Sequence, residues 1–144
     1  MVNSESEENI RKRLALALDL DDLVAATRMG KRLKPWFGVA KVGLELFAAA
    51  GPEAISAFTD MGYEVFLDLK LHDIPTTVRK ASQVIGSLGV SYLTVHTSGG
   101  VEMLSSAVEG LKAGAEAADV KPGKVLGVTI LTSDVSAPRE EFEL

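Results

Sequence analysis

The chain of 144 residues contains no cysteine. This absence excludes disulfide bonds, thiol nucleophiles and thiolate metal sites. Histidine is almost as scarce, since His72 and His96 are the only two and are too few for a histidine-rich metal cluster. No apolar stretch reaches the roughly 20 residues that a membrane-spanning helix needs. The segment from Asn3 to Arg13 is charged and lacks the apolar centre of a secretory signal.

The overall composition is that of an ordinary globular domain, 47% hydrophobic and 24% charged. The length suffices for one domain with a buried core. The formal net charge of −5 argues against general affinity for nucleic acid or for an anionic membrane, although it leaves room for a local basic pocket. These properties predict a cytoplasmic α/β protein with neither nucleic acid nor membrane as a partner.

Short apolar runs recur along the chain, and a helical pattern follows each of them. The runs cover residues 14–18, 37–42, 65–69, 92–95 and 125–131. Helices are expected over residues 23–33, 54–61, 76–88 and 100–118, with start signals at Asp21-Asp22, Pro52-Glu53, Pro75 and Ser98. Strands that alternate with helices of this length indicate βαβ units and a parallel sheet.

The two faces of each expected strand differ in character. In the first run the leucines at 14, 16 and 18 share one face, whereas two alanines and Asp19 share the other. In the third run Leu67 and Leu69 point away from Asp68 and Lys70. An apolar face combined with a face that becomes charged toward the carboxyl end of the strand predicts a (β/α)8 TIM barrel. A doubly wound open sheet, the alternative fold, would require two apolar faces.

The number of units does not fill such a barrel. A TIM barrel takes about 250 residues and eight strands, whereas this chain offers five strand-like runs. We therefore expect residues 1–13 to form an N-terminal extension. Residues 14–144 are expected to form a truncated barrel domain with strands 1 to 5 and the start of a fifth helix. The segment Ser136–Glu141 supports that start with an N-cap serine, an early proline and an acidic first turn.

The third run ends in the pattern Asp68-x-Lys70-x-x-Asp73, which brings two carboxylates next to one lysine. A structural ion pair at a strand end is the plain interpretation. Asp19 ends the first strand and Lys41 the second, so three neighbouring strands deliver charges of alternating sign to one place. Carboxylate neighbours favour the ammonium form of Lys70. Such a lysine suits proton donation or stabilisation of a carbanion, and suits Schiff-base chemistry poorly.

Other polar groups at the strand ends carry weaker signals. His96 ends the fourth strand, where a hydrogen-bonded wall residue is the more common role. The turn 97–100, Thr-Ser-Gly-Gly, could cradle a phosphate, but barrel phosphate sites usually follow strands seven and eight, so we interpret it as a cap and tight turn. Thr132 and Ser133 place hydroxyls just past the fifth strand.

The segment 68–75, Asp-Leu-Lys-Leu-His-Asp-Ile-Pro, resembles the orotidine 5′-phosphate decarboxylase family. Further matches to that family lie at the other strand ends. They are Leu16-Ala17-Leu18-Asp19, Lys41-Val42-Gly43, His96 with Ser98-Gly99-Gly100, and Leu131-Thr132-Ser133. The resemblance runs from about Leu14 to Ser133, with Thr76 standing where the family more often has asparagine.

This resemblance implies a carboxy-lyase that converts orotidine 5′-phosphate to UMP in de novo pyrimidine synthesis without a cofactor or metal. Lys70 would protonate C6 of the ring after carbon dioxide departs. Asp68 would lie beside the substrate carboxylate, and Lys41 and Asp73 would complete a catalytic Lys-Asp-Lys-Asp array. Lys70 then acts more strongly on the transition state than on the ground state.

The resemblance also implies how the nucleotide is held. Asp19 and Lys41 would bind the ribose hydroxyls, and Ile74 would line the site. Thr132 would contact the pyrimidine. Asp73 and Thr77 would reach into the site of a partner, so the enzyme would be a homodimer with composite sites.

The family binds the substrate phosphate after its last strands, which this chain lacks, so we expect little or no activity from these residues alone. Two alternatives stay open at this stage. The first is a magnesium-dependent relative that acts on sugar phosphates, such as 3-keto-gulonate 6-phosphate decarboxylase, which shares the Asp-x-Lys-x-x-Asp pattern. The second is a non-catalytic remnant that keeps only an interaction surface.

Overall fold

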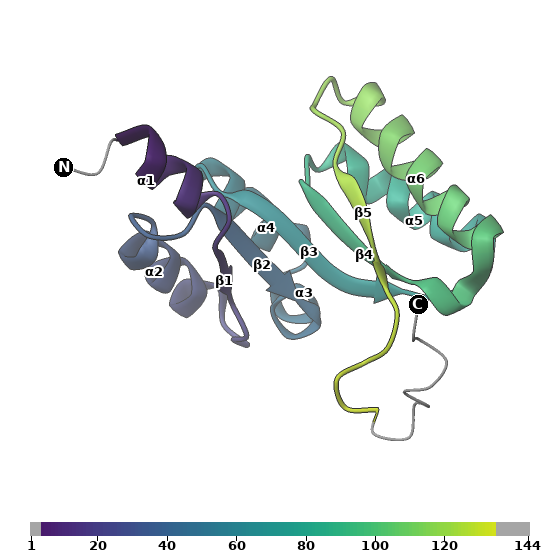
Figure 1. Ribbon diagram of the computed structural model, residues 1–144, viewed down its shortest axis with the longest axis horizontal. Helices are drawn as coiled ribbons and strands as arrows, with labels where there is room; N and C mark the ends of the chain where they lie inside the picture. Colours follow the sequence, from purple (N-terminus) through teal and green to yellow (C-terminus); the bar gives the residue numbers. More distant parts are fainter. Residues whose placement is uncertain (1–3, 135–144) are drawn as a thin grey trace.

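The computed structural model describes residues 4–134 as one layer of parallel strands covered by helices (Figure 1). The strands are β1 (Ala15–Ala17), β2 (Val39–Gly43), β3 (Glu64–Leu71), β4 (Tyr92–His96) and β5 (Lys124–Val128). The helices are α1 (Ser4–Arg11), α2 (Leu23–Leu33), α3 (Leu44–Ala50), α4 (Pro52–Asp60), α5 (Pro75–Ser87) and α6 (Gly100–Ala117), with a 3-10 turn, η1 (Thr97–Gly99). No helix within 4–134 is long and apolar enough to cross a membrane.

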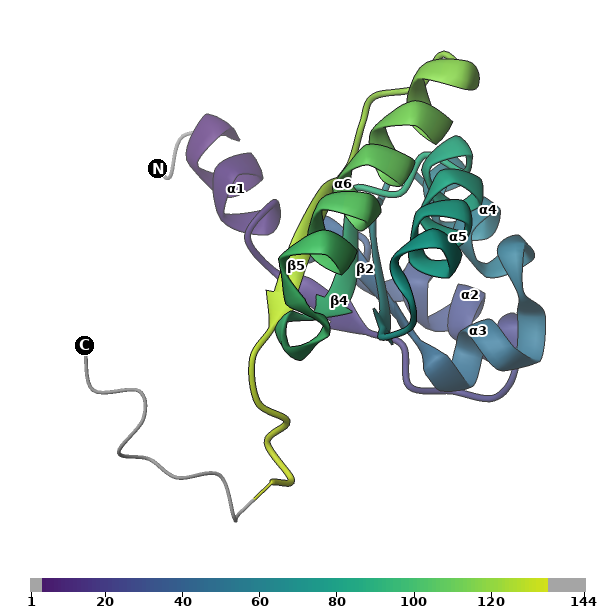
Figure 2. The same ribbon diagram turned by 90° about the vertical axis from the view of Figure 1, so that its right-hand side faces the viewer.

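The strands follow one another across the sheet in sequence order, and each pairs in parallel with the next. A doubly wound sheet reverses direction at a switch point, so this order contradicts the doubly wound alternative. Because parallel crossovers are right-handed, a sheet that always grows in one direction collects its helices on one side. Helices α2 to α6 do lie together on one side of the sheet, and α1 lies apart from them (Figure 2).

The expected strands and helices are present, with three differences. The fifth strand ends at Val128 rather than Leu131, because the chain leaves β4 there and enters a bend at Ile130. The sequence interpretation missed α1 and also α3, which is short and lies between the last residue of β2, Gly43, and Gly51. Gly51, with φ of 57°, separates α3 from α4. The expected fifth helix lies outside the described residues.

Three of the four predicted helix start signals act as expected. Pro52 begins α4, with Glu53 in its first turn. The carboxylate of Asp22 accepts a hydrogen bond from the Ala25 amide at 2.5 Å and caps α2. Pro75 occupies the first turn of α5. Ser98 was the wrong choice for α6, since Gly99 is the N-cap residue there and makes no side-chain cap bond.

The core lies between the sheet and the helices. Leu16, Leu18, Val65 and Leu67 are buried on the strand face that meets the helices, as the alternation predicts. Leu14 is the exception at 43% exposed, because it precedes β1. The largest fully buried side chains are Phe58, Leu18, Leu46, Ile55, Leu67 and Leu93.

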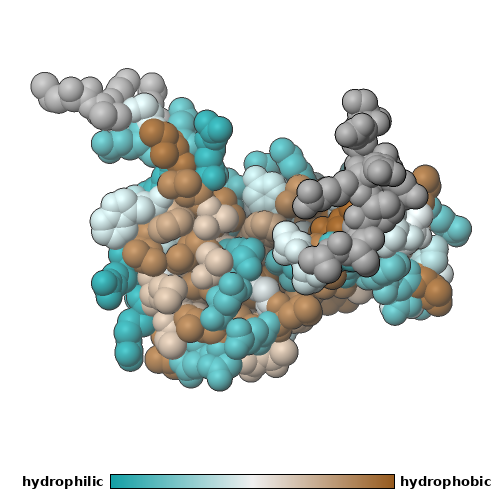
Figure 3. Space-filling view, turned by 60° about the horizontal axis from the view of Figure 1, so that its bottom comes forward, coloured by the Kyte–Doolittle hydropathy of each residue, from teal (hydrophilic) through white to brown (hydrophobic). Residues whose placement is uncertain are grey.

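The opposite face of the sheet is open in the described part of the chain. Ala15 and Ala17 of β1 and Leu126 of β5 are exposed on it. Strands β1 and β5 each pair on one side only, because they are the first and last of the five. Figure 3 shows hydrophobic and hydrophilic side chains mixed over the side of the molecule near the carboxyl ends of the strands.

Helices α5 and α6 approach each other at backbone distance. A Cβ atom on Gly114 would lie against the carbonyl oxygen of Gln83, and one on Gly86 or Gly110 would lie against Leu111 or Arg79. These three glycines are therefore required by space rather than by their backbone conformation. The close contact fixes the positions at which both helices begin, beside the carboxyl ends of β3 and β4.

We expect Gly114→Ala to destabilise the fold by about 3 kcal/mol, because overpacking at backbone distance forces the two helices apart. Urea denaturation measures this as a lower midpoint. Gly89→Ala is the matched control, since no atom lies within 4 Å of its Cβ position and only its φ of 73° is unfavourable. That control should cost about 1 kcal/mol. Equal midpoints for the two variants would contradict the packing argument.

Candidate active site

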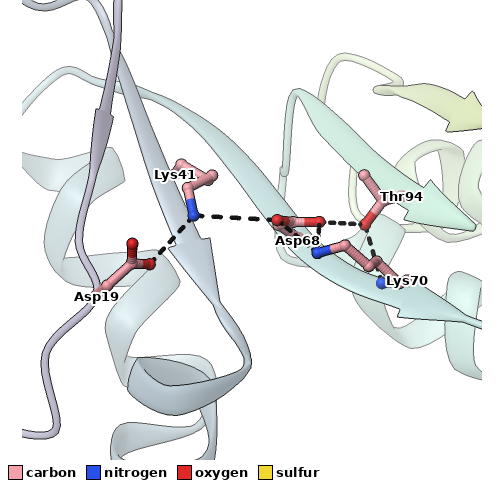
Figure 4. A network of polar contacts seen from close by, with 5 residues as sticks. All are labelled: Asp19, Lys41, Asp68, Lys70 and Thr94. Atoms are coloured by element: carbon pink, nitrogen blue, oxygen red, sulfur yellow. Dashed lines mark hydrogen bonds and ion pairs between the residues drawn. The ribbon is translucent and has the colours of Figure 1, made fainter. Parts of the chain in front are cut away.

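A chain of polar contacts crosses the carboxyl ends of four adjacent strands (Figure 4). It begins at Asp19, just after β1, whose carboxylate lies 3.1 Å from the ammonium of Lys41 on β2. Lys41 lies 4.0 Å from Asp68 on β3, and Asp68 lies 2.9 Å from Lys70. Thr94 on β4 completes the chain. The structure thus brings together the four charges at the ends of the first three strands, as the sequence predicts.

Asp68 is the centre of this arrangement. Its side chain is 14% exposed, the least of the four charged groups. Both carboxylate oxygens accept hydrogen bonds from Lys70 Nζ at 2.9 Å, and Oδ1 also accepts one from the Thr94 hydroxyl at 2.9 Å. A buried charge is tolerated when it is paired and hydrogen-bonded, and Asp68 meets both conditions.

These contacts decide the protonation state of Asp68. Burial raises the pKa of the carboxyl, but the hydrogen bonds from Lys70 and Thr94 lower it, as do the charges of Lys70 and Lys41. The lowering contributions outweigh burial, so the pKa of Asp68 lies below its ordinary value of 3.8. At neutral pH the site therefore holds an ionised carboxylate against the Lys70 amine.

Lys70 has an unusual backbone. Its φ is 51°, in the left-handed region that costs a residue with a side chain about 1–2 kcal/mol. The pairing of β3 with β4 shifts at the same point, since Leu67 pairs with Leu93 but Leu71 pairs with Val95. Lys70 lies within this bulge, and its ammonium contacts Asp68. Strand alternation predicted that the two side chains would share a face, and they do meet. It did not foresee the bulge or the left-handed backbone at Lys70.

Thr94 is a site residue that sequence reasoning missed. It is 4% exposed, and its hydroxyl bonds both the Asp68 carboxylate and the Lys70 backbone amide. A threonine inside a strand resembles any other β-branched residue in the sequence. The signal that could have found it is its position, two residues before His96 on the strand next to β3.

The other predicted site residues lie outside this chain of contacts. Within residues 4–134 the Asp73 carboxylate is in ion-pair distance of neither Lys70 nor Lys41, and it accepts a hydrogen bond from the Ile74 amide at 2.6 Å. Ile74 is 66% exposed. Thr77, in the first turn of α5, and Thr132, in the turn after β5, are also exposed.

Two hollows flank the sheet. One, of about 580 Å³, opens at the carboxyl end and is lined by His72, Asp73, Ile74, Pro75, Ser98 and Gly99. The rings of His72 and His96 lie nearby with centroids 5.3 Å apart, which ties the loop after β3 to the end of β4. The second hollow, of about 450 Å³, lies at the amino ends of β3, β4 and β5, away from the chain of contacts between Asp19 and Thr94.

The arrangement suits chemistry in which a proton is delivered to a carbon. A lysine ammonium beside a carboxylate is a positioned proton donor and a fixed positive charge. The neighbouring negative charge of Asp68 can act on an anionic group of a bound molecule. Asp19 and Lys41, at the β1 end of the chain of contacts, offer an acceptor and a donor for hydroxyl groups.

The lowered pKa of Asp68 predicts how stability depends on pH. The carboxylate contributes stability above the ordinary pKa of 3.8, and this contribution is lost as the pH falls through the lower value of the folded state. Asp68→Asn should therefore cost more stability at pH 6 than at pH 3, as measured by urea denaturation at both values. An equal cost at both pH values would contradict the pairing described above.

Comparison of the sequence with known proteins identifies a family. Residues 12–141 match the family described as Orotidine 5′-phosphate decarboxylase / HUMPS. The orotidine 5′-phosphate decarboxylase of Lactiplantibacillus plantarum is 58% identical over 93 residues, 65% of this chain and 39% of the relative. That of Anaeromyxobacter sp. strain K is 46% identical over 122 residues, 85% of this chain and 50% of the relative.

A solved structure agrees with these matches. The orotidine 5′-phosphate decarboxylase of Lactobacillus acidophilus superimposes with a TM-score of 0.76 at 42% identity, covering 85% of this chain and 55% of that one. The chain thus spans about half the length of the relatives that it matches. The five parallel strands correspond to part of their TIM barrel, which confirms the predicted fold class. The chain belongs to the Orotidine 5′-phosphate decarboxylase / HUMPS family.

Proposed function

We propose that this chain carries the catalytic half of an orotidine 5′-phosphate decarboxylase, which releases carbon dioxide from orotidine 5′-phosphate to form UMP. The observation that carries the proposal is the contact between Lys70 and Asp68 at the carboxyl end of β3, with Lys41 and Asp19 beside it. The relatives at 46% and 58% identity bear the name of this activity.

In the proposed mechanism the carbon–carbon bond to the substrate carboxylate breaks first, and its electron pair stays on ring carbon C6. The Lys70 ammonium stabilises this developing negative charge and then donates its proton to C6. The Asp68 carboxylate lies beside the substrate carboxylate and accepts two hydrogen bonds from Lys70 Nζ, which hold the amine in place. Lys70 interacts more strongly with the carbanion than with the neutral ring, so it lowers the barrier. No step needs a cofactor or metal.

Substrate binding is assigned to groups around the Lys70–Asp68 pair. Asp19 and Lys41 hold the ribose hydroxyls, Ile74 lines the site and Thr132 contacts the pyrimidine. The exposure of Ile74 and Thr132 leaves their side chains free for such contacts. A phosphate site is not assigned to any described residue.

The proposed enzyme is a homodimer in which Asp73 and Thr77 enter the site of the partner. The position of Asp73 supports this idea, since its carboxylate lies outside the ion-pair chain of its own protomer and on an exposed loop. In a dimer, the Asp73 carboxylate of the second copy would lie next to Lys70 and would extend the row of alternating charges that runs from Asp19 to Lys70.

The site can be tested in a chimera of the Lactobacillus acidophilus relative in which residues 14–134 of this chain replace the matching segment. We expect this chimera to decarboxylate orotidine 5′-phosphate. Lys70→Ala should lower its kcat by at least about a hundredfold, because both proton donation and charge stabilisation are lost. Loss of absorbance of the substrate in a steady-state assay measures the rate.

Lys124→Ala is the matched control, because this lysine begins β5 at the opposite end of the sheet. Its chimera should keep the rate of the parent.

EDTA should leave the rate unchanged, whereas a magnesium-dependent sugar-phosphate enzyme would lose activity. The 144-residue chain alone should turn over little or no substrate. A Lys70→Ala chimera at full rate would contradict the proposal.

Composite sites make a separate prediction in the same chimera. Mixing Lys70→Ala subunits with Asp73→Ala subunits, after dissociation and reassociation, should restore about a quarter of the unmutated activity, because each mixed dimer regains one intact site. Activity that stays at the level of the two separate variants would contradict a partner role for Asp73.

A further inference from the structure

We infer that Thr94 is a positioning residue, whose single hydroxyl holds the Asp68 carboxylate and the left-handed backbone of Lys70 in fixed relation. The inference deepens the proposed function and rests on it, since Lys70 is the proposed proton donor. Thr94 itself is buried beside these two groups, and we assign it no contact with the substrate.

The hydroxyl of Thr94 makes two hydrogen bonds, one as donor and one as acceptor. It donates its hydrogen to Asp68 Oδ1 at 2.9 Å, and it accepts the Lys70 backbone N–H at 2.9 Å. A hydroxyl has one hydrogen to give, so the bond to Asp68 determines its rotation. The lone pairs then face the Lys70 amide. The two bonds are therefore coupled through one atom.

The bond to the Lys70 amide lies at the irregular point of the sheet. The bulge between Leu67 and Leu71 takes Lys70 out of the regular ladder with β4, which would leave its amide without a strand partner. Thr94 supplies the missing acceptor from β4 itself. In this way the side chain replaces a ladder bond and stabilises the left-handed backbone conformation of Lys70.

The bond to Asp68 leaves the carboxylate with little freedom. Oδ1 accepts from Thr94 and from Lys70 Nζ, while Oδ2 accepts from Lys70 Nζ and faces Lys41 at 4.0 Å. The hydrogen bond from Thr94 also contributes to the lowered pKa of Asp68. Thr94 is 4% exposed, so water does not readily replace it in either bond.

Nuclear magnetic resonance of the 144-residue chain tests this with two readouts, the titration midpoint of the Asp68 carboxyl carbon and the hydrogen-exchange rate of the Lys70 amide. Thr94→Val keeps the shape of the side chain and removes the hydroxyl. We expect the Asp68 midpoint to move upward. We also expect the Lys70 amide to exchange about tenfold faster, because one hydrogen bond is lost. Thr94→Ser keeps the hydroxyl and should retain both original values.

Thr97→Val is the matched control, since the Thr97 hydroxyl donates to the Val128 carbonyl at 3.1 Å and touches neither group. If Thr94→Val does not fold, Thr94→Ala gives the same two readouts. Unchanged values in the variant without the hydroxyl overturn the inference, and so do equal changes in Thr97→Val, which would indicate general loosening. Neither readout involves turnover, so this inference and the proposed activity can fail independently.

Discussion

The site depends on keeping one ionised carboxylate, that of Asp68, in a mostly buried place. Three neighbouring donors make this possible: the ammonium of Lys70, the hydroxyl of Thr94 and, farther away, the ammonium of Lys41. They come from three adjacent strands, so the carboxylate is stable only when the sheet holds these strands in register. The chemistry and the fold are therefore linked through a single side chain.

The sheet provides this register because its strands follow one another without a reversal. Equivalent positions at the carboxyl ends then lie side by side, and charges at those positions form a row from Asp19 to Lys70. The same order puts helices α2 to α6 on one side, which leaves the charged face uncovered in the described part of the chain. In the TIM barrel of the relatives this face is the interior.

Much of this could be predicted from the sequence, for reasons that differ between residues. Leu16, Leu18 and Leu67 are buried because alternation follows from strand geometry, and Asp22 caps α2 through a local hydrogen bond. Helix α3 was missed because the seven residues between two glycines are too short to show a period. The left-handed Lys70 and the role of Thr94 arise from pairing between distant segments, and no local pattern encodes them.

The glycine contacts between α5 and α6 link the two loops that precede these helices at the carboxyl end of the sheet. Helix α5 starts right after the loop that bears Asp73, and α6 starts right after the η1 turn. Because their backbones are in direct contact, the two helices pack as one rigid unit. We therefore expect a displacement of one loop to move the other, so that the two walls of the hollow between them shift together.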